Sequence, residues 1–193
     1  MGSIFQSLGR SLFAGVVLVV LLVVAVGSNV SLNHAWMTFV MRWLHVICGV
    51  MWVGLLWYFN FVQIPTMPKI PDEQKPAIGK FIAPEALFWF RWAALATVVT
   101  GLLVAAMSGY IMQALGLKRP FLAIGIGMWI ALVMAFNVWF IIWPNQKKAL
   151  GIVAVEPAQK AKAARFAMLT SRFNTMLTIP MLYCMVAQQN GGL

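Results

Sequence analysis

The chain has 193 residues, of which 62% are hydrophobic and only 9% are charged, and its formal net charge at pH 7 is +10. No soluble domain of this size has so little polar surface with which to cover itself, so the composition predicts an integral membrane protein. The apolar runs are long enough for membrane helices rather than barrel strands. The excess of basic residues is typical of membrane-protein loops, and no nucleic-acid-binding motif accompanies it.

An all-α helical bundle is predicted, with about five transmembrane helices in a single membrane domain that covers residues 1–193. The predicted spans are approximately 12–30, 37–64, 85–112, 121–143 and 166–188. Pro65 and Pro144 are expected to end the second and fourth helices, because proline lacks the N–H that a helix interior requires. Pro157 is expected to begin the last helix, since proline is favoured in a first turn.

The distribution of basic residues predicts the orientation of the bundle. The loops 65–84 and 144–165 contain most of the loop lysines, and Arg10 precedes the first span. Since cytoplasmic loops of membrane proteins carry the excess of Lys and Arg, we expect the amino terminus and both loops to be cytoplasmic. The expected location is the inner membrane of a bacterium, with the protein crossing the lipid bilayer several times.

Small and sulfur-containing side chains indicate helix packing rather than chemistry. Gly127, Ala131 and Ala135 recur every four residues in the fourth span, a spacing that allows close contact with another helix. Cys48 and Cys184 lie in apolar runs, and the sequence has neither a CxxC nor a CxxCH motif. Metal–thiolate sites and covalently attached c-type haem are therefore excluded.

Most polar side chains of the second span share one helical face, which we call the polar stripe. At 100° per residue, the stripe contains the following residues: Arg42, His45, Gly49, Trp52, Leu56, Asn60 and Gln63. An imidazole, two amides and a glycine on one side of an otherwise apolar helix indicate one face toward lipid and one face with a function.

His45 is the stripe residue with the most specific chemistry. A neutral imidazole in a membrane helix is a suitable ligand for b-type haem iron, and Gly49, one turn later, would let a flat macrocycle approach the backbone. Trp52 and Trp57 are candidates for the walls of such a cavity. The alternative is a histidine hydrogen-bonded to a neighbouring helix, with Gly49 as a packing contact.

Two arginines lie at the predicted inner ends of their spans. Arg91 and Arg172 are candidates for a basic pocket that holds haem propionates, a lipid phosphate or an anionic substrate. The alternative for Arg91 is a side chain that extends to the membrane surface. Asn60 belongs to the same set of candidate cofactor-binding residues. Further hydrogen-bonding groups, most of which are expected to bond between helices, come from Asn137, Asn145, Asn174, Thr175 and Thr178.

Three stretches resemble a known family: WLHVICGVMWVGLLWYFNFVQIP, APEALFWFRWAALATVVTGLL and FNVWFIIWPNQKKALG. They are similar to the membrane domain of bacterial membrane-bound urate hydroxylases, the urate oxidase amino-terminal family. The likeness covers roughly residues 41–151 and continues weakly into the last helix. It implies an oxidoreductase that oxidises a purine and delivers electrons through a carboxy-terminal cytochrome c. Because the sequence stops at Leu193 without a CxxCH motif, we expect a shorter form that uses a separate cytochrome.

Two functions are consistent with these features. The first is a membrane redox protein that binds haem b through His45 and passes electrons to a cytochrome c. The second is a non-enzymatic membrane subunit or homo-oligomeric scaffold, whose polar stripe binds a partner helix or a lipid. The clustering of His45, Gly49, Trp52 and Asn60 favours the first, which is the function we predict.

Overall fold

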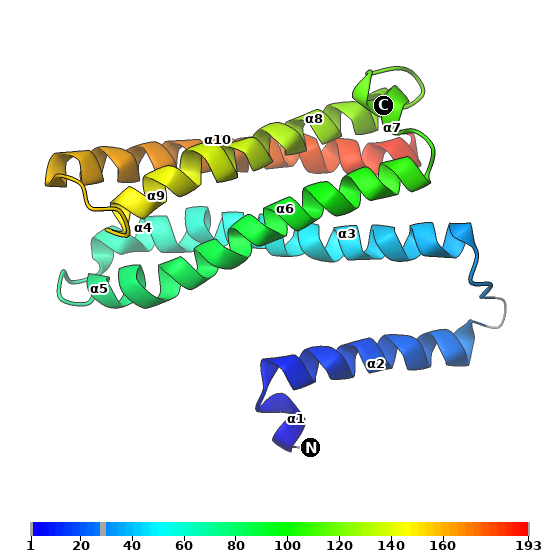
Figure 1. The fold of residues 1–193 in the computed structure, drawn as a ribbon, viewed down its shortest axis with the longest axis horizontal. Coiled ribbons are helices and arrows are strands. Elements are labelled where there is room, and N and C mark those ends of the chain that lie inside the picture. The colour runs from blue at the N-terminus through cyan, green and yellow to red at the C-terminus, as the bar shows by residue number, and fades with distance from the viewer. Residues whose placement is uncertain (1, 28–29, 193) are drawn as a thin grey trace. The chain divides into compact units, whose positions relative to one another are not determined.

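A computed structural model describes residues 2–27 and 30–192 (Figure 1). The chain forms two compact units, Met1–Phe39 and Val40–Leu193. All regular secondary structure in the described residues is helical, as the composition predicts.

The first unit contains α1 (Gly2–Phe5) and α2 (Leu8–Val26). The Ser11 hydroxyl donates to the carbonyl oxygens of Ile4 and Ser7 and so ties the two helices together. The span predicted for residues 12–30 corresponds to α2, which starts four residues earlier. Residues 28 and 29, which belong to that predicted span, lie outside the described residues.

The second unit is built on four long helical rods, which are interrupted only by changes of helix type. The first consists of α3 (His34–Trp57, which begins in the first unit), η1 (Tyr58–Gln63), α4 (Ile64–Thr66) and η2 (Met67–Lys69). The second consists of α5 (Lys75–Ala77), η3 (Ile78–Ile82) and α6 (Ala83–Met107). After α7 (Ile111–Leu115), the third consists of α8 (Leu122–Phe136), η4 (Asn137–Ile142) and α9 (Trp143–Ala149), and the fourth is α10 (Pro157–Asn190).

Prolines do not end the second and fourth predicted spans, contrary to expectation. Each of the π-helical segments η1, η3 and η4 ends two residues before a proline: Pro65, Pro84 and Pro144. In each segment the residue just before the proline donates its N–H to the carbonyl five residues earlier. The wider π turn moves aside the carbonyl that the proline ring would strike, so the helix continues. The predicted helix start at Pro157 is confirmed.

The third predicted span ends before residue 112. Helix α6 stops at Met107, where Gly109 adopts a positive φ of 76°. The Tyr110 N–H bonds to Ala105 O at 3.1 Å and the Gly109 N–H to Ala106 O at 3.0 Å. This pair of bonds is the Schellman motif, which satisfies the last carbonyls and reverses the chain.

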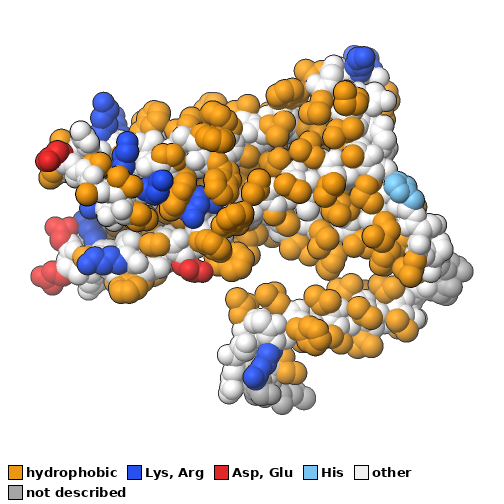
Figure 2. Space-filling view, in the orientation of Figure 1, with side chains coloured by type: hydrophobic (Ala, Val, Ile, Leu, Met, Phe, Trp, Pro, Cys, Tyr) orange, Lys and Arg blue, Asp and Glu red, His pale blue; other side chains and the backbone are white. Residues whose placement is uncertain are grey.

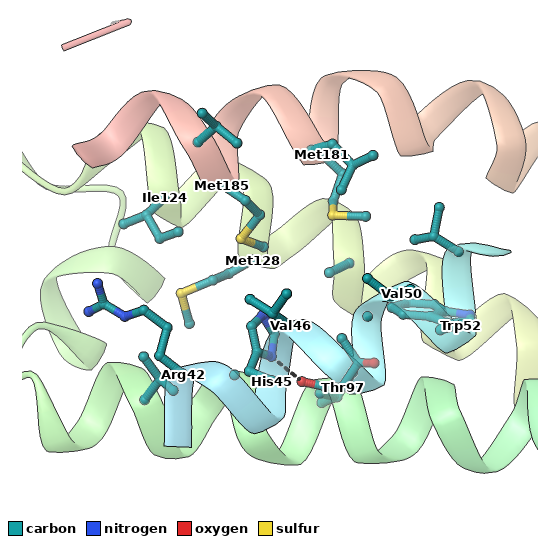
Figure 3. A pocket seen from close by; sticks show the side chains of 18 of the residues that line it. Arg42, His45, Val46, Val50, Trp52, Thr97, Ile124, Met128, Met181 and Met185 are labelled. Carbon is teal, nitrogen blue, oxygen red and sulfur yellow. Dashed lines mark hydrogen bonds between the residues drawn. The ribbon is translucent and has the colours of Figure 1, made fainter. Parts of the chain in front are cut away.

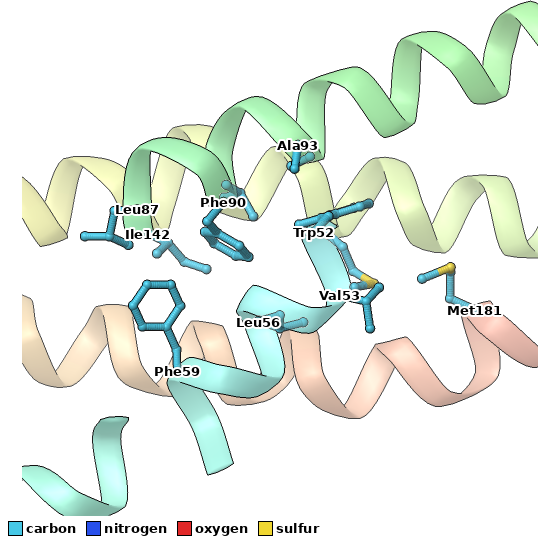
Figure 4. Close-up of a cluster of buried hydrophobic side chains, with 12 residues drawn as sticks. Trp52, Val53, Leu56, Phe59, Leu87, Phe90, Ala93, Ile142 and Met181 are labelled. Atoms are coloured by element: carbon cyan, nitrogen blue, oxygen red, sulfur yellow. The ribbon is translucent and has the colours of Figure 1, made fainter. Parts of the chain in front are cut away.

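The rods pack antiparallel around an apolar core. Figure 1 shows α10 running alongside α8 and α9, and Figure 4 shows Trp52, Leu56 and Phe59 of the first rod facing Phe90 and Met181 in the core. The predicted close approach at Gly127 is present, because a Cβ there would lie 2.9 Å from the Cβ of Cys184 on α10.

Gln188 joins the end of α10 to the start of α8. Its Oε1 accepts the Ile124 N–H at 3.2 Å, and its Nε2 donates to Pro120 O at 3.0 Å. The Ile124 N–H belongs to the first turn of α8, where backbone donors have no partner within the helix. Gln188 therefore fixes the register between the third and fourth rods.

Four described helical stretches are long and apolar enough to cross a membrane: Leu8–Val26, His34–Lys69, Lys75–Met107 and Leu122–Ala149. Helix α10 is not among them, and its span at 166–188 stays a prediction. In the second unit most of the charged side chains gather around α4, α5, α9 and the start of α10, and a smaller basic group lies at the opposite end, near α7 (Figure 2). We call the first of these the basic end of the unit.

Candidate functional site

A cavity of about 600 Å³ lies among α3, α6, α8 and α10 in the second unit. Its wall is mainly apolar, and its volume falls in the range of small-molecule and cofactor sites. Of the predicted site residues, His45, Gly49, Trp52 and Trp57 line it. The structure therefore brings these four residues of the first rod into one site.

His45 is held by the backbone of α6 (Figure 3). Its Nδ1 lies 3.0 Å from Thr97 O and 3.2 Å from Thr100 Oγ1. A carbonyl oxygen can only accept, so Nδ1 carries the proton and Nε2 keeps its lone pair. The Thr100 hydroxyl lies 2.6 Å from Ala96 O, to which it donates, and it can therefore accept from Nδ1. This is the arrangement in which a second-shell carbonyl orients a metal-binding imidazole.

Gly101 makes room for the imidazole. A Cβ at this position would lie 2.8 Å from His45 Cε1 and 3.2 Å from Nδ1. Such contacts are shorter than van der Waals distance, so only glycine lets the ring approach α6 closely enough to bond to Thr97. Sequence reasoning missed Thr97, Thr100 and Gly101. Their spacing places them on one helical face, but nothing in the sequence shows that this face meets His45.

Three methionines form the wall of the cavity contributed by α8 and α10. Met128, Met181 and Met185 all line it, and Figure 3 shows Met128 and Met185 on the side of the His45 ring away from Thr97. A thioether is a weak donor that haem iron accepts opposite histidine. Sequence reasoning treated the abundant methionines as unspecific, because their convergence depends on how the helices pack.

Two indole N–H groups on the cavity wall have no hydrogen-bond partner. Trp52 Nε1 and Trp57 Nε1 are buried, and neither finds an acceptor among the described residues. Buried donors are normally satisfied, so these two are exceptions among the described residues, and their burial keeps both N–H groups away from the open part of the cavity.

The cation that lines the cavity is Arg42, rather than Arg91 or Arg172. Tyr110, from the turn between α6 and α7, also lines it. Burial raises the pKa of the Tyr110 phenol, and the charge of Arg42 acts in the opposite direction. The cavity thus has a polar margin made of a guanidinium and a phenol that stays protonated at neutral pH.

The remaining predicted cofactor-binding residues lie outside the cavity lining. Asn60 donates to Ser171 Oγ on α10 at 2.8 Å and to Leu56 O at 2.9 Å. Arg172 is exposed on α10, and Arg91 is buried against Trp143 of α9. His45 and Asn60 of the polar stripe therefore both face inward, because each bonds to another helix of this chain.

Of the residues expected to bond between helices, Asn137 and Asn174 do so, whereas the hydroxyls of Thr175 and Thr178 donate to carbonyl oxygens of their own helix. Asn137 Nδ2 donates to Asn174 Oδ1 at 2.8 Å, and Asn174 Nδ2 donates to Met134 O at 2.9 Å. Asn145 instead donates to Ile141 O in its own helical stretch.

We expect Asn174→Ala to lower the free energy of unfolding by about 1–2 kcal/mol, because it leaves the buried Asn137 amide without its hydrogen-bond acceptor. Reversible unfolding in mixed micelles measures the change. Asn145→Ala is the matched control and should cost less, since its amide bonds within its own helix. Equal losses in the two variants would contradict the assignment of Asn174 as an interhelical bond.

The site suits a cofactor that brings its own metal better than a bare ion. No group of three or more His, Cys, Asp or Glu that could hold a metal ion occurs in the described residues. Haem iron needs only one or two protein ligands. The His45 imidazole with its free Nε2, the three methionines, the two indole rings and the Arg42 guanidinium are side chains that could hold a flat apolar macrocycle with acidic substituents.

Residues 102–191 match the family described as urate oxidase N-terminal. The match covers α7 to α10, including the methionine wall, and confirms the family resemblance where the two overlap, at residues 102–151. His45 and Thr97 precede the matched segment. Searches of curated proteins and of solved structures found no match.

Proposed function

We propose, for a chain whose residues 102–191 belong to the urate oxidase N-terminal family, a membrane-integral redox function in which His45 binds b-type haem. The observation that carries this proposal is the fixed imidazole of His45. Its Nδ1 is bonded to Thr97 O at 3.0 Å, and its ring lines the cavity among the rods.

The chain's own residues then have distinct roles. Thr97 and Thr100 hold the tautomer that leaves Nε2 unprotonated, and Gly101 lets the ring reach them. Met128, Met181 or Met185 would supply a thioether, Trp52 and Trp57 would form part of the apolar wall, and Arg42 would be a charge partner for a carboxylate. When bound, haem supplies one-electron oxidation and reduction of its iron.

The distribution of charge orients the proposed electron path. We place the basic end in the cytoplasm of a bacterium and let α10 cross the inner membrane with the other three rods. Arg42, on the cavity margin, lies near the amino-terminal end of α3, whereas the basic end surrounds α4 at the far end of the same rod. The cavity then lies toward the periplasmic face, where a separate cytochrome c can accept electrons.

The visible spectrum of the purified full chain, produced with ample haem, tests the proposal. We expect Soret and α bands in the reduced-minus-oxidised spectrum, and their nearly complete loss in His45→Ala, because no other histidine lines the cavity. His34→Ala is the matched control and should keep the bands, since these are the two histidines of the chain.

A featureless spectrum from the unmodified chain would refute haem binding. Bands that persist in His45→Ala but disappear in His34→Ala would refute the assignment of the ligand.

A further inference from the structure

Arg91 is a buried cation on α6 that does not line the cavity. Only 9% of its side chain is exposed, and its Nη1 has no hydrogen-bond partner among the described residues. It therefore does not extend to the surface, which was one alternative drawn from the sequence. Removing a guanidinium from water without an acceptor is costly, so buried charges are normally paired.

The chain offers Arg91 no counter-ion. The sequence has only four acidic residues: Asp72, Glu73, Glu85 and Glu156. Asp72 pairs with Lys75, and the Glu85 carboxylate accepts from Trp89 Nε1 at 2.9 Å. No ion pair in the described residues includes Arg91. Within the described residues no carboxylate balances its charge, and an external anion can do so.

The surroundings of Arg91 are built from one aromatic side chain and a second cation. Its guanidinium carbon lies 3.4 Å from the ring centroid of Trp143, and Lys147 Nζ lies 5.6 Å from the same centroid. Both the Arg91 guanidinium and the Lys147 ammonium therefore lie close to the same indole ring. Stacking on an indole holds the guanidinium plane and leaves its N–H groups for a ligand in that plane.

We propose that Arg91, Trp143 and Lys147 form a binding site for a phosphate-type anion, separate from the His45 cavity. Arg91 donates charge-assisted hydrogen bonds to two oxygens of the anion, Trp143 fixes the guanidinium, and Lys147 adds a second positive charge. The anion is either free phosphate or the phosphodiester of a lipid headgroup, since both present the same oxygens to the guanidinium.

Thermal unfolding of the full chain in an uncharged detergent tests this site. Inorganic phosphate is added in one series and short-chain phosphatidylglycerol in another, with chloride and short-chain phosphatidylcholine as the respective controls at equal ionic strength. We expect a saturable rise of the midpoint in at least one series. A rise with phosphate identifies a free anion as the ligand, whereas a rise with phosphatidylglycerol alone identifies the headgroup.

Arg91→Gln should lose the rise, with an apparent affinity lower by roughly tenfold or more. It should also unfold no earlier than the unmodified chain when no anion is added, because an unpaired buried charge has been removed. Arg172→Gln, at an exposed position, is the matched control and should keep the full response.

Lys147→Gln is the second variant and should weaken the response without abolishing it. No rise in either series, or an undiminished rise in both Arg91→Gln and Lys147→Gln, would overturn the proposal. Haem content does not enter this measurement, so its result is independent of the function proposed for His45.

Discussion

Gly101→Ala should weaken haem binding by roughly 10- to 100-fold while leaving the fold intact. The added methyl would lie 2.8 Å from His45 Cε1, so the imidazole must move away from α6. Movement of the ring breaks the bond from Nδ1 to Thr97 O, and the loss of such a second-shell partner typically lowers metal affinity by this factor. The free energy of unfolding should change by less than about 1 kcal/mol, because the higher helix propensity of alanine offsets the loss of the His45–Thr97 bond.

Haem titration followed at the Soret band measures the affinity of Gly101→Ala, and unfolding in mixed micelles measures its stability. Gly79→Ala is the matched control, because a Cβ at Gly79 has nothing within 4 Å. An unchanged haem affinity in Gly101→Ala would show that the position of the His45 ring does not determine binding.

Gly125→Ala should instead destabilise the protein strongly, by about 3 kcal/mol. A Cβ at Gly125 would overlap the carbonyl oxygen of Ala114 and lie 3.0 Å from its carbonyl carbon. Ala114 belongs to α7 and is fully buried, and α7 is also tied to α8 by the bond from Trp129 Nε1 to Leu115 O at 3.0 Å. Because these neighbours are backbone atoms, the clash can be relieved only by moving one helix against the other.

The unfolding midpoint of Gly125→Ala in mixed micelles is the measurement, again beside Gly79→Ala. The control should be neutral or slightly stabilising, since alanine is the better helix former. Equal stability of the two variants would contradict the close contact between α7 and α8. The two predictions differ because the His45 side chain can move away from a new methyl group at Gly101, whereas the packed backbone at Ala114 cannot move away from one at Gly125.

The sequence by itself determined the class of the protein and the chemistry of one face. The shortage of polar residues predicts a helical membrane protein, since unpaired backbone groups cannot be exposed to lipid, and four described helical stretches are long and apolar enough to cross a membrane. The period of 3.6 residues placed His45, Gly49 and Trp52 on one side of a helix, and the structure has all three on one cavity. Isolated amides in apolar helices also predicted interhelical bonds, but the sequence did not say which amides pair: Asn137 bonds to Asn174, whereas Asn145 bonds within its own helical stretch.

Only the tertiary structure decided what these side chains face. The register between rods brings Thr97 and Gly101 to His45, assembles the methionine wall, and directs Asn60 to Ser171. It also separates Arg91 from the haem candidates and buries it on Trp143. Helical periodicity determines which residues share a face, whereas the partner of that face depends on how ridges, glycines and π turns set the packing of one rod on another.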